Sequence, residues 1–142
     1  MNNVSNGGLD HYRSVGAYGA AAAEDRVRLA GNLMDAAIDR VNMARGHIER
    51  NEVALKGEAL QRAIGIIDGL RASLDHDKGG DLAGNLEALY DYMVRRLVEA
   101  NLKNDASIAS EVSGLMSEIK AGWDAIPADI TAAPDDAATT HA

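Results

Sequence analysis

The sequence contains no cysteine and no phenylalanine, and both of its prolines, Pro127 and Pro134, stand near the C-terminus. Without cysteine the chain has no disulfide, no thiolate ligand for zinc and no thiol nucleophile. Proline destabilises a helix interior by about 3 kcal/mol, so its absence from residues 1–126 permits long uninterrupted helices. The chain of 142 residues is long enough for one domain with its own hydrophobic core.

Positive charge is also scarce, with 14 Lys and Arg against 22 Asp and Glu and a net charge of −8. Such a chain repels phosphate backbones, which disfavours nucleic-acid binding. No apolar run approaches the ~20 residues that cross a bilayer, and residues 1–10 lack the features of a signal peptide. We therefore expect a cytoplasmic protein without membrane insertion.

Apolar residues recur at steps of three and four in four segments, which is the pattern of amphipathic helices. The first helix is expected to begin after Glu24 or Asp25, and the second between Asn51 and Glu58. A loop over 75–80 precedes the third, with Asp81 as its N-cap, and the fourth follows a turn at Asn104-Asp105 and ends near residues 123–126. The prediction is an all-α, antiparallel up-down-up-down four-helix bundle over residues 24–126. Residues 1–23 form a flexible or lid segment with a short helix, and residues 127–142 a disordered tail.

Motifs for catalysis or metal binding are missing from this pattern. A carboxylate-bridged di-iron bundle needs Glu-x-x-His pairs, which the chain lacks, and the four histidines are too scattered for a sequence-local metal motif. We predict no catalytic residue, no metal and no cofactor. One alternative from another class is a histidine-phosphotransfer bundle that uses His76 or His47, although Lys78 and Gly79 follow His76 in a segment that reads as a loop. A generic four-helix adaptor is a second alternative.

The third helix is apolar on more than one side. Tyr90 and Tyr92 project about 200° apart at 100° per residue, so both cannot enter one core seam, and Val94 and Val98 flank the row of Leu97. Two interpretations are open: a core contact shared by three neighbouring helices, or an apolar groove that a partner segment fills.

Residues 85–97 read NLEALYDYMVRRL and residues 99–105 read EANLKND. This long pattern, with Trp123 near the end, resembles the FliS family of flagellar export chaperones over roughly residues 9–126. The first helix departs from the family pattern: it keeps Leu33 and Asp35 but has Met34 where an aromatic residue is usual. The chain therefore resembles a divergent member.

The resemblance implies a non-enzymatic cytoplasmic chaperone that binds the disordered C-terminal segment of flagellin, prevents premature polymerisation and delivers flagellin to the flagellar type III export gate. It also implies that an N-terminal lid covers part of the groove and moves aside. The groove candidates are apolar or aromatic residues of three helices: Leu33, Tyr90, Tyr92, Met93, Leu97 and Ile108. The lid candidates are Leu9, Tyr12 and Val15. For Leu33 and Leu97, a core position is favoured over a groove position.

Overall fold

The computed structural model describes the backbone of residues 4–126 and the side chains of residues 21–126. Four α-helices and no strand make up this part of the chain. They are α1 (Val4–Glu49), α2 (Val53–Ala72), α3 (His76–Lys103) and α4 (Ala106–Asp124). The all-α prediction is therefore confirmed. The predicted tail, residues 127–142, lies outside the described residues.

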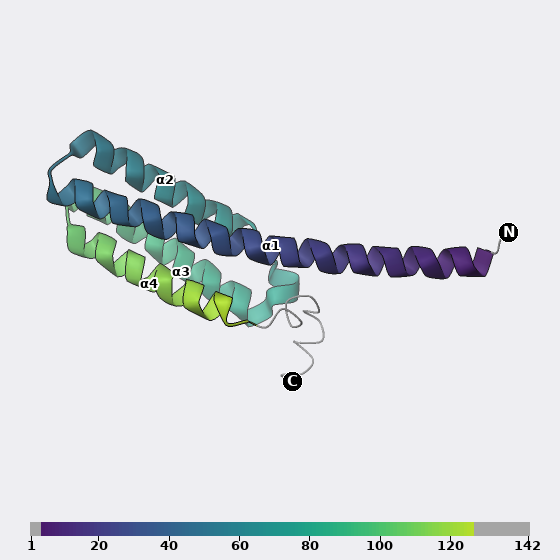
Figure 1. Ribbon diagram of the computed structural model, residues 1–142. Helices are drawn as coiled ribbons and strands as arrows, with labels where there is room; N and C mark the ends of the chain where they lie inside the picture. The colour runs from purple at the N-terminus through teal and green to yellow at the C-terminus, as the bar shows by residue number, and fades with distance from the viewer. Residues whose placement is uncertain (1–3, 127–142) are drawn as a thin grey trace. The chain divides into compact units, whose positions relative to one another are not determined.

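Residues Ala30–Ala125 form one compact unit, in which short turns reverse the chain between successive helices. α2 packs against α3 and α3 against α4, and the helices lie side by side in Figure 1. Side-chain contacts link α1 to α4 and to the residue before α2. Arg45 Nη1 donates to Ser110 Oγ of α4 at 3.2 Å, and His47 Nδ1 lies 2.9 Å from Oε1 of Glu52, the residue that precedes α2. The antiparallel four-helix bundle is thus confirmed.

The start of the first helix is a correction to the prediction. The sequence predicts a start after Glu24 or Asp25, whereas the helical backbone of α1 already begins at Val4. Alanines at positions 20–23 favour this, because alanine has the highest helix propensity of all residues. Asp25 pairs with Arg28, one turn later, at 2.5 Å. Residues Met1–Leu29 belong to a separate unit with Ile126–Ala142, and the lid boundary at residue 23 stays a prediction.

The core of the bundle combines a few large side chains with many alanines. The largest fully buried side chains come from all four helices: Met34, Val41, Leu60, Ile67, Leu70, Tyr90, Met93, Leu97, Val112 and Met116. Alanines such as Ala37, Ala63 and Ala109 lie fully buried between them. Small side chains let helix backbones approach closely and so reduce the number of bulky residues needed to fill the interior. The scarcity of aromatic residues is therefore compatible with a packed core.

Two turns meet at one end of the bundle through a buried lysine. Asn51 and Asn104 adopt left-handed backbone conformations with φ of 57° and 53°, which asparagine tolerates at helix C-termini. Lys56 is buried, and its Nζ donates to the backbone oxygen of Asn101 at 3.2 Å and to Oδ1 of Asn104 at 3.1 Å. The ammonium group therefore compensates the partial negative charge at the C-terminus of α3.

The segment before α3 also differs from the prediction. Asp75 is the N-cap, because its side chain accepts a hydrogen bond from the Lys78 amide at 3.0 Å. His76 is therefore the first residue of α3 instead of a loop residue, whereas the predicted cap at Asp81, which directly follows the non-helical residue Gly80, stays a prediction. Gly80 interrupts the helical backbone with φ of 54° and ψ of −128°. The glycine pair thus marks a kink one turn inside α3.

Candidate functional site

One side of α3 carries a stripe of residues that faces α4. Leu82, Leu89, Tyr92 and Arg96 follow one another at steps of seven, three and four, so they lie on one flank of the helix. Tyr92 and Arg96 both bond to Glu111 of α4, which fixes this flank as the one that meets α4. We call this surface, formed by the α3 stripe with Glu111 and Leu115 of α4, the α3–α4 seam.

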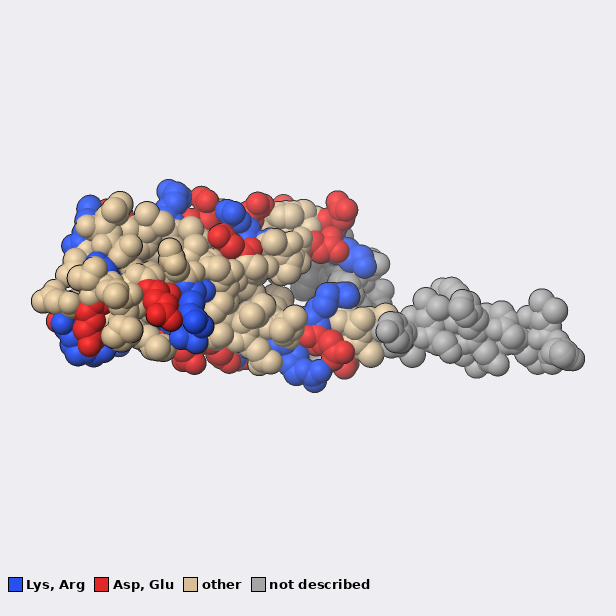
Figure 2. Space-filling view, turned by 90° about the horizontal axis from the view of Figure 1, so that it is seen from above, with Lys and Arg blue, Asp and Glu red and all other residues tan. Residues whose placement is uncertain are grey.

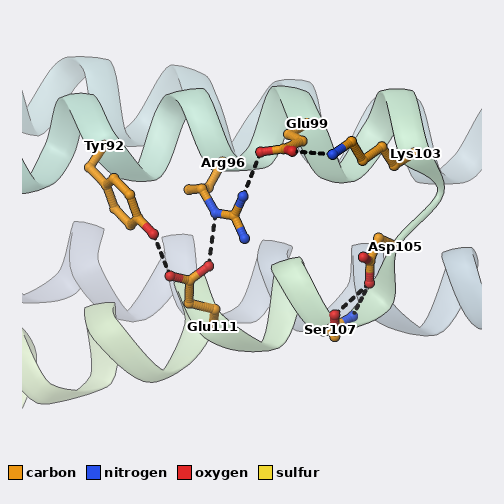
Figure 3. A network of polar contacts seen from close by, with 7 residues as sticks. All are labelled: Tyr92, Arg96, Glu99, Lys103, Asp105, Ser107 and Glu111. Atoms are coloured by element: carbon orange, nitrogen blue, oxygen red, sulfur yellow. Dashed lines mark hydrogen bonds and ion pairs between the residues drawn. The ribbon is translucent and has the colours of Figure 1, made fainter.

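A network of hydrogen bonds and ion pairs occupies one half of the α3–α4 seam (Figure 3). The Tyr92 hydroxyl donates to Glu111 Oε2 at 2.5 Å, and Arg96 Nε donates to Oε1 of the same carboxylate at 2.9 Å. Arg96 Nη1 also donates to Glu99 at 2.5 Å, and Lys103 Nζ donates to the other oxygen of Glu99 at 2.5 Å. Glu111 is therefore the one carboxylate in Figure 3 that ties α4 to two side chains of α3.

The bonds in this network shift the pKa values of its members. The Tyr92 hydroxyl, and then Arg96, lower the pKa of the Glu111 carboxyl below its ordinary value. Lys103 and the charge of Arg96 lower the pKa of Glu99 in the same way. Conversely, the bond to Glu111 raises the pKa of Tyr92. These three shifts favour ionised Glu111 and Glu99 and a neutral Tyr92, and the bond from Tyr92 to ionised Glu111 holds α3 to α4.

Acid is expected to weaken the α3–α4 contact through Glu111. Because its pKa is lower in the folded state than in the unfolded one, its contribution is present above the unfolded value of about 4.3 and is lost as pH falls through the folded value. Urea denaturation of Glu111→Gln and the parent between about pH 7 and pH 3 should show a stability difference that shrinks toward acid. Glu118→Gln, on the same helix, is the control. A Glu111→Gln difference that stays constant with pH contradicts this role.

Beyond the network the α3–α4 seam is apolar and accessible. Leu82 is 56% exposed and Leu89 is 36% exposed, while Leu115 of α4 is half-buried and packs against the core. Isolated exposed leucines are common on protein surfaces. Here, however, they continue the stripe that carries the half-buried Tyr92. This half of the seam therefore exposes apolar side chains that follow one flank of α3.

The structure distributes the six predicted groove residues over different surroundings. Tyr90, Met93, Leu97 and Ile108 are buried in the bundle. Burial in a low-dielectric interior also raises the pKa of the Tyr90 hydroxyl. Tyr92 is half-buried on the α3–α4 seam, and Leu33 is half-buried on α1, where it packs against the core.

Leu82 and Leu89 are two further binding candidates that the sequence does not reveal. Their spacing continues the stripe of core residues on the third helix, so they cannot be told apart from core residues by spacing. The useful signal is their offset: both precede the buried residues Ala83 and Tyr90 by one position. The predicted lid residues Leu9, Tyr12 and Val15 lie on the helical backbone of α1, but their side chains lie outside the described residues. Their role in a lid stays a prediction.

The surroundings of two histidines bear on the phosphotransfer alternative. His47 lies in the last turn of α1, is largely buried and pairs with Glu52. His76 is exposed, but it begins α3 and lies 3.1 Å from Glu87. Neither has the exposed mid-helix position that phosphotransfer requires. Within residues 21–126, acidic side chains and histidines form no group able to hold a metal ion, and none of the described helices is long and apolar enough to cross a membrane.

Comparison with known proteins points in one direction. The sequence model of the family described as "Flagellar protein FliS" matches residues 9–129. The chain is 46% identical to the flagellar secretion chaperone FliSB of Pseudomonas aeruginosa, covering 83% of this chain and 94% of that protein. It is 46% identical to the flagellar secretion chaperone FliS of Salmonella typhimurium over 82% of this chain and 87% of the other. The corresponding Vibrio cholerae chaperone is 36% identical over 85% and 89%.

Proposed function

The chain belongs to the FliS family of flagellar secretion chaperones, and from this premise we propose that it binds the C-terminal segment of flagellin. In this proposal it acts in the cytosol, keeps flagellin from polymerising prematurely and delivers it to the flagellar export apparatus. It acts by stoichiometric masking, without a chemical step and without a cofactor.

The observation that carries this proposal is the apolar half of the α3–α4 seam. Leu82 and Leu89 are exposed beside the half-buried Tyr92, so their apolar surface becomes available to a partner without unfolding the bundle. Burying a leucine side chain gives about 1.5–3 kcal/mol. A disordered partner loses conformational entropy when it orders and therefore needs a large contact surface. In this proposal the seam supplies part of that surface.

Isothermal titration of the full chain with the flagellin C-terminal segment tests this proposal. We expect submicromolar binding, more favourable than about −8 kcal/mol, with the negative heat-capacity change of apolar burial. Leu89→Asp should weaken binding about tenfold or more, because it places a charge where apolar contact is needed. Leu102→Asp, an equal change at an exposed leucine of the same helix that lies off the seam, is the matched control.

Different outcomes test the partner, its binding surface and the lid separately. No detectable binding of the parent chain refutes flagellin as the partner. Equal weakening by Leu89→Asp and Leu102→Asp places the partner elsewhere on α3. Removal of residues 1–18 should speed association if the predicted lid of Leu9, Tyr12 and Val15 competes with flagellin, and unchanged kinetics contradict the lid alone.

A further inference from the structure

Methionine is the only sulfur-containing residue type of this chain, which has five methionines and no cysteine. A mild oxidant such as a peroxide therefore finds thioethers and no thiol. Among the residues with described side chains, Met34 and Met116 are 1% exposed and Met93 is 0% exposed, whereas Met43 is 46% exposed. Without unfolding of the bundle, a dissolved oxidant thus meets a single accessible methionine among residues 21–126.

The turn of α1 that carries Met43 is anchored in the core, because Val41 and Ala44 on either side of it are buried. Uncharged side chains lie open to solvent between the charged groups of the bundle surface (Figure 2), and Met43 is one of the exposed apolar residues of this bundle. Oxidation at Met43 therefore adds a polar oxygen in contact with water. Oxidation at Met34 instead places that oxygen inside the core, where an unpaired polar group is costly.

A guanidinium group lies beside the exposed sulfur. Arg40, one turn earlier on α1, places its Nη1 atom 3.8 Å from the sulfur of Met43. A thioether is a weak acceptor, and a guanidinium carries five N–H donors. Oxidation converts this weak acceptor into a polar sulfoxide, whose oxygen accepts the charge-assisted hydrogen bond that a guanidinium donates. Arg40 is therefore positioned to favour the oxidised side chain over the reduced one.

We propose that Met43 is a reversible oxidation site, at which a peroxide converts the thioether to a sulfoxide and Arg40 donates a hydrogen bond to the oxygen that the sulfur gains. The sulfur lone pair attacks one oxygen of hydrogen peroxide, so an S–O bond forms while the O–O bond breaks. The sulfur loses two electrons and the peroxide gains them. The departing hydroxide takes the proton of the transferred hydroxyl group and leaves as water.

Peroxide kinetics on the full chain, without flagellin, test this site. Peptide mass spectrometry follows the sulfoxide at each methionine. Met43 should oxidise at least about tenfold faster than the three buried methionines, because those react only when the bundle opens. In urea the rates should converge, since unfolding removes the burial. Methionine sulfoxide reductases with a dithiol should then restore Met43, as two thiols become a disulfide and the oxygen leaves as water. Oxidation of Met43 no faster than that of the buried methionines overturns the proposal.

Two arginine variants test the hydrogen bond. Arg45 is the matched control, because it lies on another flank of α1, where it bonds to Ser110 of α4. Arg40→Ala should slow the oxidation of Met43 about threefold, since the donor no longer stabilises the charge that develops on oxygen. Arg40→Lys, which keeps a cationic donor, should restore most of the rate, and Arg45→Ala should leave it unchanged. Equal rates in the parent and Arg40→Ala overturn the role of Arg40.

Glutamine, an uncharged polar side chain, tests whether the fold tolerates a polar group at each position. Met43→Gln should melt within about 2 °C of the parent, because surface substitutions change stability little. Met34→Gln, the matched change at a buried position of the same helix, should lower the melting temperature by about 10 °C or more. Thermal unfolding monitored by circular dichroism measures both shifts. Equal losses in the two variants overturn the conclusion that the folded chain tolerates oxidation at Met43.

Discussion

Leu97→Ala is expected to lower the free energy of unfolding by about 2–5 kcal/mol. The Leu97 side chain is 0% exposed and belongs to the core cluster with Tyr90 and Met93. Its truncation removes apolar contacts and leaves a cavity, because tightly packed neighbours relax only in part. Urea denaturation monitored by circular dichroism measures the change. In a marginally stable domain this loss is a large fraction of the total stability.

Leu102→Ala provides the matched comparison on the same helix. Leu102 is 81% exposed, so its truncation should change the free energy of unfolding by no more than about 0.5 kcal/mol. The same two variants address the groove prediction. If Leu97 contacts flagellin directly, Leu97→Ala reduces affinity while stability stays near that of the parent. That result contradicts the buried position of Leu97 and favours a groove that includes it.

Helix content and helix order follow from the sequence because they depend on local properties. Steps of three and four in the apolar residues, short connecting segments and the absence of proline before Pro127 are sufficient for a four-helix bundle. The cap at Asp105 is local too: its carboxylate accepts from the amide of Ser107, two residues later, at 2.9 Å. The start of α1 is harder to predict, because a run of alanines extends a helix past an acidic cap candidate such as Asp25.

The candidate surfaces depend on contacts between helices, which a single sequence does not specify. Tyr90 and Tyr92 both read as groove residues, yet Tyr90 enters the core and Tyr92 lies at its edge bonded to Glu111. Which of them is buried depends on the rotation of α3 about its axis. A broad apolar stripe fixes that rotation only to within about 100°, the angle between successive residues of an α-helix. The same uncertainty explains why Leu82 and Leu89 are exposed although their spacing continues the core stripe of α3.

Charge pairs between helices also depend on how the helices pack against one another, which a single sequence does not specify. The approach of Glu111 to Tyr92 and Arg96 requires the register of α4 against α3, and these residues lie 19 and 15 positions apart in the chain. Sequence reasoning therefore predicts the elements and many of the residues of a surface. The structure is needed to show which of those residues share one seam.

Gly80→Ala and Gly84→Ala are expected to change stability in opposite directions, although only four residues separate them in α3. At both positions an added Cβ atom would meet nothing within 4 Å, so available space does not distinguish them. The backbone does. Gly80 has φ of 54° and ψ of −128°, a conformation that residues with a side chain rarely adopt. Gly84 follows the kink, on the helical part of α3.

Gly80→Ala should therefore lower the free energy of unfolding by about 1–3 kcal/mol, the usual cost of holding a non-glycine residue in such a conformation. Gly84→Ala should raise it by about 0.5–1 kcal/mol, because alanine has the higher helix propensity and restricts the unfolded chain. Urea denaturation of both variants and the parent measures the two effects. A neutral or stabilising Gly80→Ala would mean that α3 passes through residue 80 without a kink. In that case the exposure of Leu82, two residues beyond Gly80, would have to arise from the packing of a straight helix.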